Sequence, residues 1–155
     1  MTGVQDQWDK FVKLKDVKRV VAFGGWAFSN EPGTSHVIRN GVKPENRAKF
    51  AQNIVDFVKS SGIDGVDFDW EYPGATDIDA SDPGTPEDGS NYLKFLQTVK
   101  SGLGDGKTVS FAAPASFWYL KSFKIKLMAQ VVDYIVYMTY DLHGELPSPH
   151  SARVF

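Results

Sequence analysis

The feature that most constrains this chain is the segment 64–73, DGVDFDWEYP, which places four carboxylates within eight residues. In its second half, apolar and acidic residues alternate strictly, and this period of two predicts a β-strand. On such a strand Asp67, Asp69 and Glu71 share one face, with neighbouring side chains about 6–7 Å apart. Asp64 is out of phase with this row, so we expect it to hold the start of the strand.

Three acids on one face repel each other unless a substrate, a cation or shared protons stabilise them. They suit an exposed face of an antiparallel sheet, a site for Mg, Ca or Mn, or a glycosidase site. In the last case one carboxyl donates a proton and another stabilises a cationic transition state. The cation site fits less well, because Phe68 and Trp70 stand between the acids, where an EF-hand loop needs turn residues.

Short apolar runs alternate with helical patterns along the rest of the chain. The expected strands are 19–23, 66–71, 108–113 and 134–140, and the expected helices are 7–15, 44–60, 90–101 and 125–131. This alternation predicts an α/β fold with a parallel sheet, either doubly wound or a (β/α)8 barrel. It argues against an exposed antiparallel strand. No Gly-x-Gly-x-x-Gly follows a strand, so the phosphate cradle of a dinucleotide site is missing.

Two turn-rich segments, 26–41 and 74–89, show no regular period and are expected to be loops. The second loop carries five acids that we expect to be solvated: Asp77, Asp79, Asp82, Glu87 and Asp88. Ser90 is the expected N-cap of the helix that follows.

Composition excludes several classes of function. A length of 155 residues suits one domain, and a net charge of -2 gives no reason to expect nucleic acid or an anionic membrane surface as a partner. The absence of cysteine excludes disulfides, thiolate metal sites and a cysteine nucleophile. No apolar run approaches the roughly 20 residues that span a bilayer. Residues 1–6 lack the basic start and apolar core of a signal peptide.

The spacing Asp64-x-x-Asp67-x-Asp69-x-Glu71 resembles the signature of family 18 glycoside hydrolases, the chitinases, and segment 64–75 is similar to their fungal and bacterial branch. The resemblance implies part of a (β/α)8 TIM barrel, with strands equivalent to the third to sixth. It also implies that residues 1–144 are a partial catalytic domain and that 145–155 form an irregular tail. A complete barrel takes about 250 residues. A sheet of only four of the eight strands cannot close into a barrel. We therefore expect exposed sheet edges, and with them marginal stability or aggregation.

Further motifs carry the same resemblance. Residues 22–26 resemble the third-strand motif, although Ala22 stands where the family usually has Ser, which removes one supporting hydrogen bond. Residues 112–116 resemble the end of the fifth strand, and residues 138–141 the sixth-strand motif that faces the substrate. The implied structural residues are Asp64, Gly65, Gly24 and Gly25, and the implied substrate-binding residues are Tyr72, Trp26, Asp141, Met138 and Ala113. For Met138 alone, core packing is the favoured interpretation.

The position of Glu71 at the end of the strand makes it the expected general acid, with Asp69 raising its pKa and Asp67 sharing a proton with Asp69. The resemblance implies a retaining, substrate-assisted reaction in which the N-acetyl group of the sugar attacks the anomeric carbon. Asp69 would orient that group and Tyr140 would hydrogen-bond its oxygen. Asp141 would contact the sugar.

This mechanism implies chitin or a chitooligosaccharide as partner and needs no metal or organic cofactor. Because chitin is extracellular, we expect secretion of the full-length protein. The alternatives are a chitin-binding lectin-like protein and an inactive fragment of a chitinase. Lectin-like relatives usually lack the acid, whereas Glu71 is present here.

Overall fold

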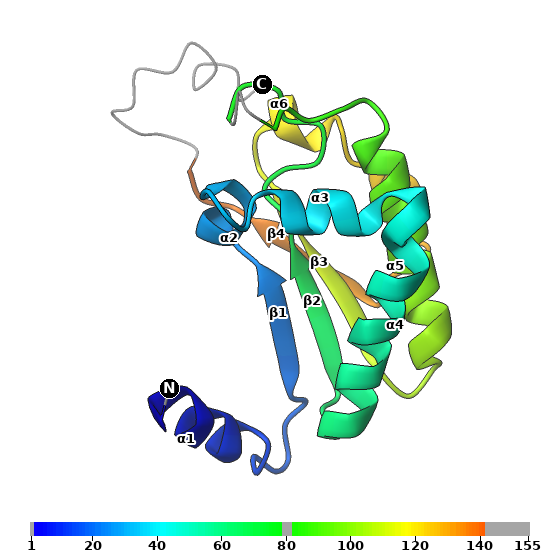
Figure 1. Ribbon diagram of the computed structural model, residues 1–155. Coiled ribbons are helices and arrows are strands. Elements are labelled where there is room, and N and C mark those ends of the chain that lie inside the picture. Colours follow the sequence, from blue (N-terminus) through cyan, green and yellow to red (C-terminus); the bar gives the residue numbers. More distant parts are fainter. Residues whose placement is uncertain (1, 79–81, 142–155) are drawn as a thin grey trace.

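The computed structural model describes residues 2–78 and 82–141. Within them the strands are β1 (Val20–Gly24), β2 (Gly65–Asp69), β3 (Thr108–Pro114) and β4 (Tyr134–Met138). The helices are α1 (Thr2–Phe11), α2 (Trp26–Asn30), α3 (His36–Val42), α4 (Pro44–Ser61), α5 (Asp88–Leu103), α6 (Phe117–Leu120) and α7 (Ile125–Met128). The four strands form one parallel sheet in the order β1-β2-β3-β4, which confirms the expected α/β architecture (Figure 1).

Helices α4 and α5 pack side by side against one face of this sheet (Figure 1). The apolar stripe of α4 is buried, as its period of 3.6 residues predicts, with Ile54 and Val58 in the core. Phe68 from β2 meets Phe95 from α5 with ring centroids 5.0 Å apart. Gly62 ends α4 in a left-handed conformation, at the residue that the sequence suggested.

The expected loop over residues 26–41 is wrong, because it contains α2 and α3. These helices have five and seven residues, too few to show a period among their Ser, Asn, Gly and Pro neighbours. Ile38 and Val42 of α3 are four residues apart and both buried, so packing against the core stabilises this short helix.

Several element boundaries also differ from the expectation. The acidic strand ends at Asp69, not at Glu71, and the fourth strand ends at Met138. Helix α5 begins at Asp88 with Glu87 at its N-cap position, so Ser90 is not the cap. The first helix ends at Phe11 and α7 ends at Met128, and α6 was not expected. The element types are thus more predictable than their ends.

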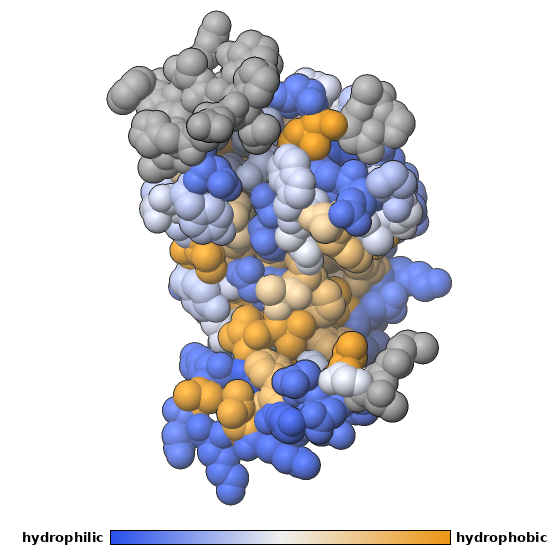
Figure 2. Space-filling model, turned by 90° about the vertical axis from the view of Figure 1, so that its left-hand side faces the viewer, coloured by the Kyte–Doolittle hydropathy of each residue, from blue (hydrophilic) through white to orange (hydrophobic). Residues whose placement is uncertain are grey.

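The other sheet face, opposite α4 and α5, carries the side chains of Ala22, Asp67, Ser110 and Val136 by strand alternation and register. Figure 2 looks toward the side of the molecule away from these helices and shows hydrophobic residues gathered over its middle and lower part. Within the described residues, β1 and β4 are the edge strands. None of the described helices has the length and apolar character needed to cross a bilayer.

We expect the chain to associate with itself through the edge of β4. Val136 is 43% exposed on this edge strand, and an unpaired apolar edge favours pairing with another chain. Val136→Lys should reduce association in sedimentation velocity over a range of concentrations. Leu127→Lys is the matched control, because Leu127 is similarly exposed but lies on α7. A sharp unfolding transition that does not depend on concentration in the parent chain would contradict the expectation.

Candidate active site

The ends of β1 and β2 approach each other at the two glycines that follow Phe23. The Gly25 N–H donates to the carbonyl of Asp69 over 2.7 Å. A Cβ on Gly24 would lie 2.0 Å from the same carbonyl oxygen, so no other residue fits there. Both glycines also have positive φ angles, 124° and 93°. This close approach brings the end of β1 against the acid-bearing end of β2.

Asp67 and Asp69 lie on one face of β2, as the alternation predicted. The hydroxyl of Ser110 on β3 donates to Asp67 Oδ1 over 2.5 Å. Asp69 Oδ1 is buried and, among the described residues, has no hydrogen-bond partner. A buried oxygen without a hydrogen-bond partner destabilises the folded state unless it carries a proton or binds a ligand.

Glu71 follows the end of β2 rather than lying on the strand, so it does not continue the strand row. Its side chain is nevertheless 9% exposed, and its backbone N–H donates to Ser29 Oγ on α2 over 3.1 Å. The Ser29 hydroxyl lies 3.5 Å from the Asp69 carbonyl, so α2 supports the turn that follows the strand. Sequence reasoning missed Ser29, because it lies in the segment that we expected to be a loop.

Burial raises the pKa of all three carboxyl groups above the ordinary range. The pKa of Asp67 is raised by burial, which the bond from Ser110 partly offsets. The pKa of Asp69 is raised by burial and by the charge of Asp67. The pKa of Glu71 is raised by burial, by Asp69 and by Asp141, against a hydrogen bond from Tyr72. Each carboxyl therefore keeps its proton to a higher pH than it would in water, which suits proton transfer.

Aromatic side chains lie next to Glu71. Tyr72 is buried, and this burial, together with the charge of the Glu71 carboxyl and a hydrogen bond with it, raises the pKa of the Tyr72 phenol. The Tyr72 ring stacks on Tyr119, with centroids 4.5 Å apart, and meets Trp26 at 6.5 Å. Trp26 is 55% exposed, so an indole face is open to a ligand. Aromatic faces of this kind are typical of sites that hold apolar faces of small molecules.

The residues expected at the end of the fourth strand divide into two groups. Tyr140 and Asp141 are exposed, and Asp141 acts electrostatically on Glu71 and on Tyr140. Met138 and Ala113 are buried, at 5% and 2% exposure, and belong to the hydrophobic core. For Met138, core packing is therefore the arrangement that the structure displays. Substrate contact by any of these four residues stays a prediction.

Within the described part of the chain, no group of three or more histidine, cysteine, aspartate or glutamate side chains could hold a metal ion. What the geometry provides is a set of partly buried carboxyls beside aromatic side chains. The model of glycosyl hydrolases family 18 matches residues 4–155. The chain belongs to glycosyl hydrolase family 18.

Relatives and solved structures agree with the family. "Probable chitinase LysM18" of Penicillium expansum is 50% identical over 144 residues, which is 93% of this chain but 10% of that protein. Chitinase B of Serratia marcescens is 37% identical over 151 residues, 86% of this chain and 28% of that protein. Catalytic domain 2 of the Ostrinia furnacalis group II chitinase superposes with a TM-score of 0.77 at 28% identity, over 92% of this chain and 38% of that structure.

This family 18 chain thus spans about a tenth of the length of the fungal relative and less than half of the solved structure. The fold neighbours confirm that its four parallel strands are part of a barrel. The division of the chain at residue 144 stays a prediction, because residues 142–155 lie outside the described part.

Two motif residues lie at the other end of the acidic strand. Asp64 accepts hydrogen bonds from Arg19 N and Nε, both over 2.8 Å, and these lower the Asp64 pKa to about 2. It holds the start of β2, as its phase in the sequence suggested. A Cβ on Gly65 would lie 2.4 Å from the Thr108 carbonyl oxygen, so β2 and β3 approach closely here. These family 18 signature residues place the strand rather than line the site.

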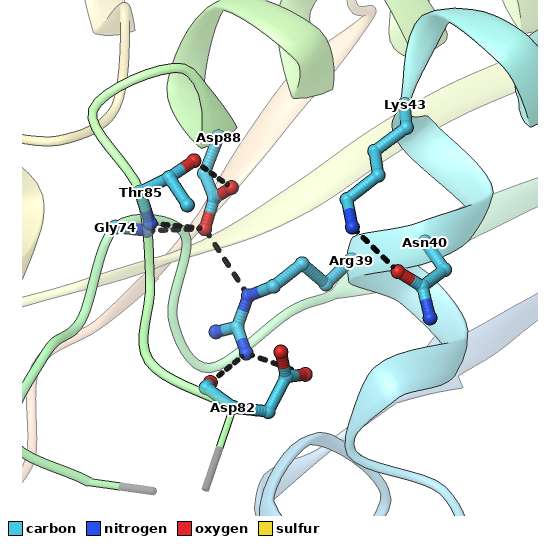
Figure 3. Close-up of polar contacts among 7 residues, drawn as sticks. All are labelled: Arg39, Asn40, Lys43, Gly74, Asp82, Thr85 and Asp88. Atoms are coloured by element: carbon cyan, nitrogen blue, oxygen red, sulfur yellow. Dashed lines mark hydrogen bonds and ion pairs between the residues drawn. The ribbon is translucent and has the colours of Figure 1, made fainter. Parts of the chain in front are cut away.

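A buried ion-pair cluster lies between α3 and α5 (Figure 3). Arg39 on α3 pairs with Asp88 on α5 over 3.2 Å and with Asp82 over 3.0 Å, and the side chains of Arg39 and Asp88 are 7% and 3% exposed. Asp88 also accepts from the Gly74 and Thr85 N–H groups over 3.0 and 3.2 Å. The cluster therefore joins α3, α5 and the segment after β2.

The same cluster is linked to the candidate site through Trp70. The Arg39 guanidinium lies 5.8 Å from the centroid of the buried Trp70 ring, next to Glu71 in the chain. The expectation that Asp88 is a solvated loop acid is wrong, and Asp82 is paired. Asp77 accepts hydrogen bonds from Trp118 and Tyr119. Asp79 lies outside the described residues. Sequence reasoning missed this cluster, because the partners are far apart in the chain.

We expect Asp88→Ala to lower the free energy of unfolding by about 3 kcal/mol, because it leaves the buried Arg39 with a single carboxylate partner. Urea denaturation measures this loss. Asp82→Ala is the control, and it should cost about 1 kcal/mol or less, since Asp82 is more exposed and its backbone carbonyl still accepts from Arg39. Equal losses in the two variants would contradict the structural role of the buried pair.

Proposed function

We propose that this chain carries catalytic residues of a chitin hydrolase and that Glu71 is its general acid and base. The observation that carries the proposal is the environment of Glu71. The residue is buried, and the pKa of its carboxyl is raised by burial and by neighbouring carboxylates. A carboxyl that retains its proton at higher pH suits protonation of a glycosidic oxygen.

The proposed reaction retains configuration and uses the substrate as nucleophile. Glu71 donates its proton to the oxygen between two sugars while the N-acetyl oxygen of the substrate attacks the anomeric carbon. The glycosidic bond breaks, and an oxazolinium ion forms on the sugar. Glu71, now ionised, then removes a proton from water, which attacks the anomeric carbon and opens the ring of the intermediate.

The neighbouring residues receive supporting roles. Asp69 orients the N-acetyl group and stabilises its developing positive charge, and the unpartnered Asp69 Oδ1 supports this role. Asp67 shares a proton with Asp69. Tyr140 donates to the N-acetyl oxygen, and Asp141 contacts the sugar. Both groups act electrostatically within the same site, which supports placing them near one substrate.

The aromatic surface suggests where the polymer lies. Trp26 offers an exposed ring and packs against the buried Tyr72, the neighbour of Glu71 in the chain, and we assign both residues to sugar binding. The substrate class is proposed from the relatives, several of which are named chitinases. One structure of an Ostrinia furnacalis chitinase variant is a complex with an N-acetylglucosamine oligomer.

Two other functions compete with hydrolysis. A chitin-binding lectin-like protein would not need a buried Glu71 with a raised pKa. A fragment without activity of its own is compatible with the short span of the chain relative to its family. Secretion of the full-length protein is also a proposal, supported by a relative named "Secreted chitinase LysM12".

We expect Glu71→Gln to lower kcat by roughly 10²–10⁴-fold, because the amide cannot transfer the proton. Hydrolysis of a fluorogenic chitooligosaccharide measures this loss, and titration with the unlabelled oligomer should show that binding is retained. Glu87→Gln is the control, because Glu87 is exposed at the start of α5. Binding without hydrolysis in the parent chain would instead favour the lectin-like function.

The rate should also depend on pH through the raised pKa of Glu71. The general acid acts only while protonated, so kcat/KM falls as pH rises through this pKa. Asp69→Asn removes a like charge that raises the Glu71 pKa. The alkaline limb of the pH profile should therefore move to lower pH in this variant. An unchanged limb would show that Asp69 does not set the proton affinity of Glu71.

A further inference from the structure

Three aromatic rings form a row across the ends of three neighbouring strands. Trp26 begins α2 directly after β1, Tyr72 follows β2, and Tyr119 lies on α6 after β3 (Figure 1). The Tyr72 ring stacks on Tyr119, with centroids 4.5 Å apart, and meets the edge of Trp26 at 6.5 Å. Neighbouring strands lie about 4.8 Å apart, so one ring from each strand end is enough to make the row continuous.

The row ends at an exposed ring. Tyr72, in the middle, is buried and Tyr119 is partly buried, whereas Trp26 is 55% exposed. In the described part of the chain, Tyr72 is the only ring that the Trp26 ring meets. The backbone of Trp26 is fixed by α2, where its carbonyl accepts from Asn30 Nδ2 over 2.9 Å. The direction of the exposed indole therefore depends on the ring of Tyr72.

A carboxylate anchors the other end of the row. Asp77 Oδ2 accepts from the Tyr119 hydroxyl over 3.3 Å and from Trp118 Nε1 over 3.2 Å. Burial, with the charge of Asp77 and this hydrogen bond, raises the pKa of the Tyr119 phenol, so the hydroxyl remains a donor. Gly89 of α5 lies so close to the Ser122 carbonyl, shortly after α6, that a Cβ there would overlap it. These contacts hold α6, and with it the Tyr119 ring, in place.

We propose that Tyr119 is a positioning residue that, through the ring of Tyr72, holds the indole of Trp26 in a fixed direction for a sugar. Asp77 supports this role by fixing Tyr119. The consequence for sugar binding rests on the proposed function, whereas the ordering of the indole does not.

The physical reason is the free energy needed to order an exposed side chain. An indole that turns freely loses that freedom when a ligand binds to it, and this loss weakens binding. A ring that is already held loses less. Tyr72 can hold the Trp26 indole only while its own ring stays in place, and the stack with Tyr119 covers one face of that ring. Removing the stacked ring should therefore loosen the indole two residues along the row.

Packing of the core alone does not explain the row. Rings that serve only the core are fully buried, as Phe95 and Phe111 are, whereas the row runs out to the exposed Trp26. Tyr119 itself is partly exposed on a helix of four residues and lies outside the buried core cluster. Its replacement should therefore leave the fold intact. If Tyr119→Leu does not fold, Tyr119→Gln, which also lacks the ring, takes its place.

The first test follows the Trp26 indole of the 155-residue chain without a ligand. The 15N relaxation of its Nε1–H group measures its mobility, and Trp26→Ala identifies its signal among the four tryptophans. Tyr119→Leu removes the stacked ring and should increase the mobility of the indole. Tyr119→Phe keeps the ring and loses only the bond to Asp77, and Leu120→Ala changes the packing of α6 without removing the ring. Both controls should remain close to the parent.

The second test measures the binding of an N-acetylglucosamine oligomer by calorimetry. Tyr119→Leu should weaken binding roughly twofold to tenfold, the range that corresponds to one aromatic pair. In a chain that carries Trp26→Ala, the same change should have less than about a twofold effect, because the indole that Tyr119 positions is absent. Equal losses in both backgrounds would overturn the inference. Where the chain hydrolyses the oligomer, KM should rise and kcat should change little.

The outcomes also separate this inference from the proposed function. An indole that is equally mobile in Tyr119→Leu and in the parent overturns the inference, whether or not the chain binds the oligomer. Equal increases in Tyr119→Leu and Leu120→Ala overturn it too, because the effect then belongs to the packing of α6. An increase in Tyr119→Leu alone, in a parent chain that binds no oligomer, supports the positioning of the indole and counts against the proposed function.

Discussion

The hydrogen bond from Gly25 N–H to the Asp69 carbonyl, 2.7 Å long, fixes the point at which β2 stops and the chain turns. Beyond it, Trp70 enters the core and Glu71 lies against Ser29 of α2. The contact requires Gly24, since a side chain there would overlap the carbonyl. Two glycines at the end of β1 thus determine where the chain turns after the acidic strand.

Two kinds of contact, an aromatic core and an ion pair, hold the strands and helices together near the strand ends. The aromatic core joins β2 to α5 through Phe68 and Phe95, and the Arg39–Asp88 pair joins α3 to α5 beneath Trp70. Apolar burial supplies most of the stability. The ion pair adds directional bonds, because Asp88 also holds the backbone of Gly74 and Thr85. The segment that follows β2 is therefore anchored by polar contacts rather than by burial alone.

The parallel sheet, the long helices and the shared face of Asp67 and Asp69 could be predicted from the sequence, because each depends on a local period or spacing. The place of Glu71 could not, because the strand ends before it. The role of Asp64 followed from its phase, and the structure confirms it. Helices α2 and α3 could not be predicted, since their stability comes from contacts with distant residues rather than from their own turns. The contacts of Asp88 with Arg39 and of Ser110 with Asp67 could not be predicted for the same reason. In each pair the two residues are more than 40 positions apart in the sequence.

The carboxyl face of the sheet has a further consequence for ligand binding. The protein already buries the carboxyls of Asp67, Asp69 and Glu71 enough to raise their pKa values. A ligand that binds on the face of the molecule shown in Figure 2 displaces water and so lowers the dielectric constant around these carboxyls further. Such a ligand stabilises the neutral acids over the charged ones. Occupancy of this face and uptake of a proton from solution are therefore linked equilibria, so an uncharged ligand binds more tightly as the pH falls.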